Sequence, residues 1–136
     1  MFKNLFQSYA EAFSHLDIHG ISSFYEFPMV FYSETGEVVS FDKQAFNKNS
    51  QALLALYKEF AVAKVDFNIE AEQQLSQSLH LVSVNWHFKK DSGDLIYSAL
   101  TRYLLGDTPT GPKIKSVFVV NESSKIGQLK TKKSLD

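Results

Sequence analysis

The spacing of apolar residues changes along this chain, from a helical period to a period of two, at about residue 64. Before that point apolar side chains recur at three- and four-residue steps, which is typical of amphipathic helices. From residue 65 onward Val65, Phe67 and Ile69 alternate with polar and charged residues, as in a strand with one buried face. Helices followed by consecutive long strands predict an α+β fold, with helices packed into a strongly curved antiparallel sheet.

The same spacing predicts the individual elements. A helix is expected over residues 2–16, a second from the N-cap Asp17 until Pro28 ends it, and a third from about 42 to 60. A short hairpin separates the second and third helices, and four long strands follow the third. The expected strands cover residues 29–32, 38–39, 65–71, 79–88, 95–105 and 114–120, with a loop at 106–112.

Length and composition limit the class of protein. The 136 residues fit one domain, expected at residues 1–121, followed by a polar, lysine-containing tail at 122–136 that is expected to be disordered. The formal net charge of −1 argues against nucleic-acid binding, and the absence of cysteine excludes disulfides and thiolate metal sites. Without a signal peptide or a run of 18 apolar residues, a cytoplasmic protein with no membrane partner is expected.

The strand expected at 95–105 is apolar on both faces. Tyr97 and Tyr103 share one face, whereas Leu100 and Leu104 share the other. A sheet with helices on one side normally has a polar second face in contact with water. We therefore expect a homodimer that forms through the outer face of the sheet.

Three groups of local motifs follow one another along the chain. The first joins Y-A-E-A-F at 9–13 to L-D-I-H-G-I at 16–21, and the second is F-Y-E-F-P-M-V-F at 24–31. The third combines V-S-V-N-W at 82–86, D-S-G at 91–93 and T-R-Y-L-L at 101–105. Together they resemble the nuclear transport factor 2-like superfamily, also called the cystatin-like or polyketide cyclase/ketosteroid isomerase-like fold. The resemblance covers residues 2–121 and implies a cone-shaped barrel around the N-terminal helices, with a cavity at its open end.

The resemblance also implies candidate catalytic residues. Steroid isomerases of the superfamily combine a tyrosine of helix one with two acids, and Tyr9 matches the tyrosine. The acids do not match, because Glu34 falls in the turn beyond the first strand and Thr101 stands where the second acid is expected. Dehydratases of the superfamily use a cavity histidine, for which His80 is the candidate. If the chain is an enzyme, Tyr9 and His80 are therefore the catalytic candidates; whether it is one stays open.

Seven aromatic residues are candidates for a ligand-binding pocket. Apolar walls with a few hydroxyl and N–H groups suit a small hydrophobic or aromatic molecule. The seven are Tyr9, Phe13, Tyr25, Tyr57, Trp86, Tyr97 and Tyr103. In the alternative interpretation these rings fill the core, and the chain is a non-catalytic homodimeric protein-association module. Neither a metal nor a cofactor is expected, because the chain has no metal-ligand spacing and no glycine-rich phosphate loop.

Overall fold

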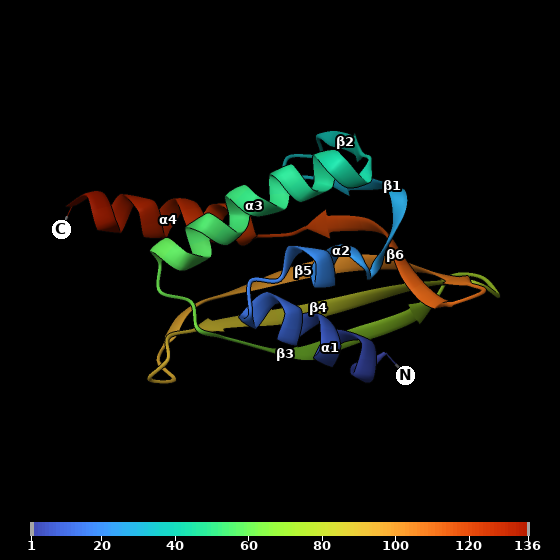
Figure 1. Cartoon of the computed structure of the whole chain (residues 1–136), viewed down its shortest axis with the longest axis horizontal. Coiled ribbons are helices and arrows are strands. Elements are labelled where there is room, and N and C mark those ends of the chain that lie inside the picture. Colours follow the sequence, from blue (N-terminus) through green and yellow to red (C-terminus); the bar gives the residue numbers. More distant parts are fainter. Residues whose placement is uncertain (1, 136) are drawn as a thin grey trace.

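The computed structural model describes residues 2–135, and the side chains of residues 2–131. The described residues form four helices and six strands in an α+β arrangement (Figure 1). In chain order they are α1 (Lys3–Ser14), α2 (Ile18–Ser22), β1 (Tyr25–Tyr32), β2 (Val38–Phe41), α3 (Lys43–Glu59), β3 (Lys64–Gln74), β4 (Leu79–Lys89), β5 (Leu95–Thr108), β6 (Gly111–Val119) and α4 (Glu122–Leu135).

One sheet contains all six strands, in the order β2-β1-β6-β5-β4-β3. Four of the five strand pairs are antiparallel, but β1 and β6 run parallel. The sheet bends so that β1 and β2 lie on the same side as α3 (Figure 1). It stays open, with β2 and β3 at its edges. The predicted α+β class and the mostly antiparallel sheet are confirmed, but the predicted barrel is not, and one pair is parallel, because alternation fixes which face of a strand is buried and not which strands become neighbours.

The start of β1 differs from the sequence prediction. Helix α2 begins as expected, with the Asp17 side chain accepting a hydrogen bond from the Gly20 N–H, but it ends at Ser22. Tyr25, which was expected within that helix, and Pro28, which was expected to end it, both lie in β1. Pro28 is tolerated there because the register between β1 and β6 shifts between Tyr25 and Val30, where a proline without an N–H breaks no regular ladder.

The predicted loop at 106–112 is almost entirely strand. Strand β5 continues to Thr108 and β6 begins at Gly111, so the connection is only two residues long. The Thr108 hydroxyl donates to the Gly111 carbonyl at 2.6 Å, and Gly111 has a φ of 109°, a conformation that favours glycine. Pro109 therefore lies in a tight turn and Pro112 near the start of β6, so neither proline interrupts the hairpin.

The C-terminal segment also differs from expectation. Residues 122–136 were expected to be disordered, yet Glu122–Leu135 form helix α4, which packs against β5 (Figure 1). Residue 136 lies outside the described residues. Ile126 and Leu129, three residues apart, are half-buried against the core. Two apolar side chains on one helix face are enough to attach this otherwise polar segment.

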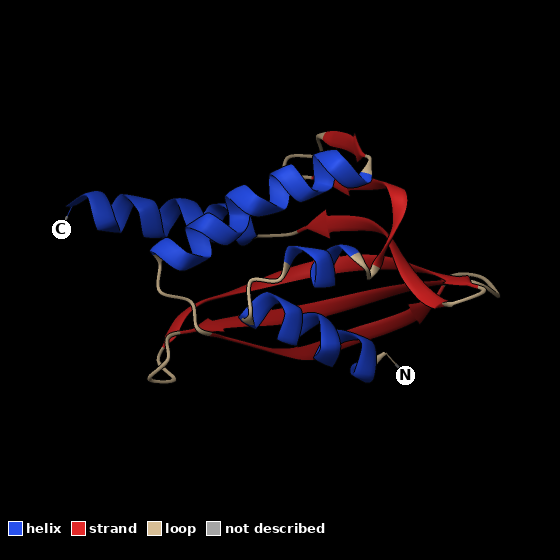
Figure 2. Ribbon diagram, viewed as in Figure 1, coloured by secondary structure: helices blue, strands red, loops and turns tan. Residues whose placement is uncertain are grey.

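The core lies between the concave face of the sheet and helices α1, α2 and α3 (Figure 2). Alternation along β5 is confirmed, because Tyr97, Ala99, Thr101 and Tyr103 are buried. Phe6 of α1 is fully buried and contacts the rings of Tyr9, Trp86 and Tyr103. Aromatic side chains thus supply most of the contact between the first helix and the sheet.

Candidate functional site

A cavity of about 90 Å³ lies inside the core, between α1, α3, the inner face of the sheet and the first residue of α4. Most of its lining is aromatic or aliphatic. Six of the seven predicted residues contribute to its walls: Tyr9, Phe13, Tyr25, Tyr57, Trp86 and Tyr103. The structure therefore brings these six together around one space that the side chains of the chain do not fill.

Two hydrogen-bonded pairs form what we call the deep end of the site. The Tyr9 and Tyr25 hydroxyl oxygens are 2.6 Å apart, and the Trp86 Nε1–H donates to the Tyr103 hydroxyl at 2.9 Å. All four side chains are buried. Burial raises the pKa of Tyr9, Tyr25 and Tyr103 above the ordinary tyrosine value, so all three phenols are neutral.

A second polar group, which we call the Glu122 cluster, consists of Glu122, Tyr57 and Tyr97. The hydroxyls of Tyr57 and Tyr97 each donate to Glu122 Oε2, both at 2.9 Å. Among the described residues, no hydrogen bond is made to Glu122 Oε1. Glu122 and Tyr57 line the cavity, whereas Tyr97 supports the carboxylate without forming part of the wall.

Burial raises the pKa of the Glu122 carboxyl, because desolvation penalises its charged form. The two phenol donors oppose this shift, and the carboxylate of Glu34 adds to it. Burial also raises the pKa of Tyr57 and Tyr97, with the Glu122 charge as the next cause, so both are neutral donors. The cluster therefore holds a carboxyl group whose pKa is higher than that of an exposed carboxyl.

Glu34 fixes the first turn of α4 in place. Its two carboxylate oxygens accept hydrogen bonds from the Ser124 backbone N–H at 2.8 Å and from the Ser124 hydroxyl at 2.5 Å. The Ser124 hydroxyl is the main cause of the lowered pKa of Glu34. The carboxylate nearest to the isomerase base position is thus used to cap a helix and does not line the cavity.

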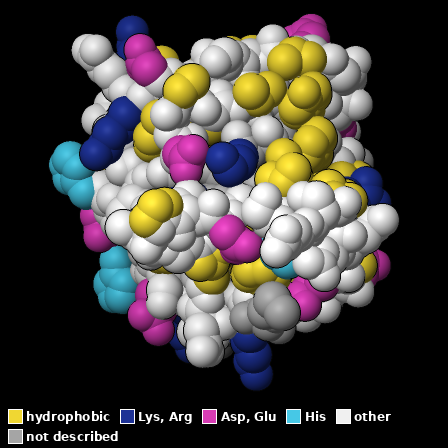
Figure 3. All heavy atoms as spheres, turned by 90° about the vertical axis from the view of Figure 1, so that its right-hand side faces the viewer, with side chains coloured by type: hydrophobic (Ala, Val, Ile, Leu, Met, Phe, Trp, Pro, Cys, Tyr) yellow, Lys and Arg dark blue, Asp and Glu magenta, His cyan; other side chains and the backbone are white. Residues whose placement is uncertain are grey.

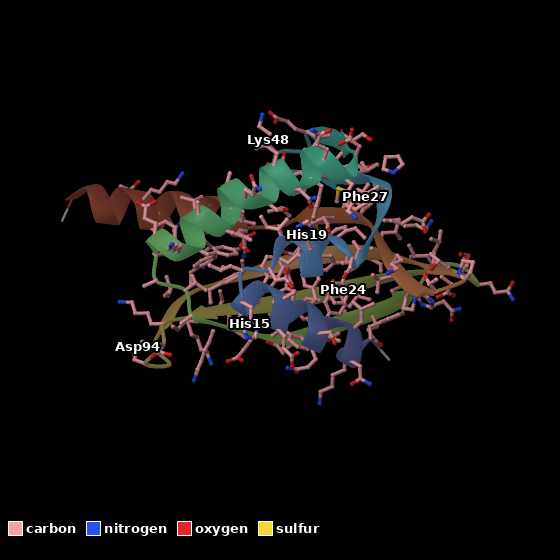
Figure 4. The ribbon with its side chains drawn as sticks, in the orientation of Figure 1. His15, His19, Phe24, Phe27, Lys48 and Asp94 are labelled. Carbon is pink, nitrogen blue, oxygen red and sulfur yellow. The ribbon has the colours of Figure 1, made fainter. Side chains whose placement is uncertain are left out.

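His80 does not reach the cavity. Its ring packs edge-on against Phe2, with 5.1 Å between ring centroids, and its Nε2 is 4.0 Å from Asp107 Oδ2. His15 and His19 are exposed on the outside of α1 and α2 (Figure 4). The structure therefore does not bring Tyr9 and His80 together, and a reaction that uses them as an acid/base pair is not supported.

Sequence reasoning missed Glu122, the one acidic residue that lines the cavity within the described part of the chain. Its neighbours are serine and lysine, which led to its assignment to a disordered tail. The available signal was its position directly after the last strand, together with Ile126 and Leu129 at helical spacing. No Lys, Arg, His or Asp of the described residues lines the cavity, and these residues contain no cluster of three potential metal ligands.

The exterior carries charges of both signs. On the face drawn in Figure 3, Lys and Arg side chains are interspersed with Asp and Glu, without a broad area of one sign. Within the part of the chain that the structure describes, no helix is long and apolar enough to span a membrane.

Solved structures of the same fold are numerous but distant in sequence. A cystatin-like domain of unknown function from Nostoc punctiforme has a TM-score of 0.68 at 12% identity, covering 86% of this chain and 72% of its own. An NTF-2 like protein of unknown function from Shewanella oneidensis has a TM-score of 0.64 at 16% identity, covering 85% and 92%. A ketosteroid isomerase-like protein from Erwinia carotovora atroseptica has a TM-score of 0.59 at 16% identity, covering 82% and 86%.

The sequence itself also has a family match. Residues 2–122 match a family described as NTF2-like protein (DUF6841). No curated protein matches the chain. The family match ends at Glu122, so it includes the residue that joins the last strand to the cavity wall.

Proposed function

This chain belongs to the NTF2-like family DUF6841, and we propose that it binds a small, largely apolar molecule in the cavity between its helices and sheet. The observation that carries the proposal is the cavity itself, about 90 Å³ in volume and walled by aromatic side chains. A dry apolar cavity of about 150 Å³ accommodates benzene, so this smaller cavity sets one ring or a short branched chain as the upper limit of ligand size. Members of the fold commonly bind small ligands, which supports the same interpretation.

The hydrogen-bonding groups of the cavity walls limit which ligands can bind. At the deep end, Tyr9 is paired with Tyr25 and Trp86 with Tyr103, so these groups are satisfied without a ligand. Breaking either pair would leave a buried polar group without a partner, which costs about 1–3 kcal/mol. We therefore propose that the ligand contacts the deep end through its apolar part and that any polar group lies near Glu122.

A cavity-filling variant tests this proposal. Ser50 of α3 is buried and lines the cavity, whereas Ala52 of the same helix is exposed. We expect Ser50→Phe to weaken the binding of benzyl alcohol by about tenfold or more, since the new ring occupies the space, with Ala52→Phe as the matched control. Binding is measured by ligand-observed NMR. Equal affinity in both variants would place the ligand elsewhere, and no binding to the unmodified protein would contradict the proposal.

We also propose that the outer face of the sheet forms a homodimer interface. Ile96, Leu100 and Leu104 point away from the cavity side of β5 and are only half-buried. Burial of such side chains against a second copy would remove apolar surface from water. Sedimentation of the protein and of Leu100→Glu is the test. A dimer that dissociates in the variant supports the interface, and a strict monomer at high micromolar concentration contradicts it.

A further inference from the structure

The charges that face the cavity are not balanced. Among the described residues of the lining, Glu122 is the one acidic side chain, and no cationic side chain lines the same space. The other polar groups of the wall are neutral hydroxyls, amides and the indole N–H of Trp86. A ligand anion would therefore meet a carboxylate without a compensating cation, which favours neutral or positively charged ligands.

The carboxylate has hydrogen-bonding capacity left for a ligand. Tyr57 and Tyr97 both donate to Oε2, while Oε1 has no hydrogen bond among the described residues. A carboxylate accepts up to about four hydrogen bonds, so Glu122 has capacity to accept more. Because Glu122 lines the cavity, a donor group on a ligand has a charged acceptor in reach.

The aromatic walls favour the same charge. Phe13, Tyr57, Trp86 and Phe88 line the cavity together with Glu122. The faces of aromatic rings attract ammonium groups within about 6 Å, and the attraction increases where water is excluded. The carboxylate and the ring faces are independent features, and both stabilise a positive charge.

On the basis of the proposed function, we propose that the ligand is a small amine, with its ammonium group hydrogen-bonded to Glu122 and its apolar body against the aromatic walls. The cavity volume of about 90 Å³ restricts the apolar body to one ring or a short branched chain. The Glu122 cluster then acts as the recognition site for the charged group, and the deep end receives the apolar part.

Occupation of the site by an amine also removes an unfavourable feature of the empty protein. Burial raises the pKa of Glu122, so its charged form is costly in the absence of a counter-ion. The titratable groups that act on it are Tyr57 of α3, Tyr97 of β5 and Glu34 of the turn after β1, and none of them is cationic. A ligand ammonium would supply the missing opposite charge and lower that pKa again.

Three probes with one ring and different charges test the proposal: benzylamine, benzyl alcohol and benzoate. At pH 7 we expect benzylamine to bind about tenfold more tightly than benzoate, with benzyl alcohol between them. Glu122→Gln, which keeps the shape of the side chain, should reduce the affinity for benzylamine by about tenfold and change that for benzyl alcohol by less than about twofold. Asp94→Asn is the control for loss of one negative charge, because Asp94 lies at the distant tip of the β4–β5 hairpin (Figure 4).

The pH dependence of the unmodified protein is a second test that needs no variant. As the pH falls through the raised pKa of Glu122, the carboxylate is protonated, so the affinity for benzylamine should decrease while that for benzyl alcohol stays constant. Binding of benzyl alcohol with equal or weaker binding of benzylamine overturns the amine proposal and leaves the proposed function standing. Failure of all three probes to bind overturns both.

Discussion

The deep end of the site and the Glu122 cluster use tyrosine in different ways. At the deep end, tyrosine and tryptophan form neutral pairs that are complete by themselves, with 2.6 Å between the Tyr9 and Tyr25 oxygens. In the Glu122 cluster two tyrosines donate to one charged oxygen and leave the other oxygen available. A buried phenol therefore stabilises the core when its partner is already fully hydrogen-bonded, and supports a binding site when its partner can accept further hydrogen bonds.

The largest expected effect concerns packing at the deep end. Phe6→Ala removes a fully buried ring that contacts Tyr9, Trp86 and Tyr103, so we expect the free energy of unfolding to fall by about 3–5 kcal/mol. Urea denaturation followed by tryptophan fluorescence measures it. Leu129→Ala on α4, where the side chain is only half-buried, is the control and should cost clearly less. Equal losses would mean that packing around Phe6 contributes no more to stability than the contact of α4 with the core.

A smaller effect separates the two kinds of tyrosine. Tyr103→Phe leaves the buried Trp86 N–H without its acceptor, and we expect a loss of about 1–3 kcal/mol in the free energy of unfolding. Tyr97→Phe removes one of two donors to Glu122 and leaves the Tyr57 bond in place, so the expected loss is smaller. Thermal or urea unfolding of the two variants under one set of conditions gives the order. The reverse order would mean that the hydrogen bonds of the Glu122 cluster contribute more to stability than the Trp86–Tyr103 pair does.

The smallest effects are in the pH dependence of stability, and they have opposite signs at the two acids near the start of α4. The pKa of Glu122 is raised by folding, so the native state binds more protons there and the contribution of Glu122 to stability increases as the pH falls from neutral toward the ordinary carboxyl value of 4.5. The pKa of Glu34 is lowered, so its contribution is present above 4.5 and is lost as the pH falls through its folded value.

Unfolding of Glu122→Gln and Glu34→Gln between pH 7 and pH 4 checks these signs. The stability difference between the unmodified protein and Glu122→Gln should shift in favour of the unmodified protein at lower pH, because the unmodified side chain becomes neutral. The difference from Glu34→Gln should change in the other direction. Curves that run parallel for both variants would mean that neither carboxyl is perturbed by folding.

Much of the fold was predictable because the period of apolar residues reports burial directly. The helix–strand order, the buried face of β5 and the relation to NTF2-like proteins all followed from local spacing and motifs. The parallel pairing of β1 with β6 did not, since it joins residues such as Tyr32 and Phe118 that are far apart in the chain. The short turn after Thr108 was missed because Pro109 and Pro112 suggested a loop, whereas hydrogen bonding across the hairpin extends both strands.

The aromatic wall residues of the site were predicted from the sequence, whereas its acidic residue was found only in the structure. Tyr9, Tyr25 and Trp86 were identified because large aromatic residues on buried faces must meet in the interior of a small domain. His80 was proposed because it shares a strand face with Val82 and Trp86, but its end of β4 lies against Phe2 and outside the cavity. The residue that now defines the proposed ligand, Glu122, was assigned to a segment without expected structure.

The sequence by itself determined which faces of α1, α3 and the central strands are buried, because alternation and helical periodicity are local properties that each residue shares with its near neighbours. Only the tertiary structure decided that a carboxylate from the end of the chain joins phenols of α3 and β5 at the cavity wall. That contact links residues 65 and 25 positions apart. Such a contact exists because packing places α4 against the sheet, and no local pattern encodes it.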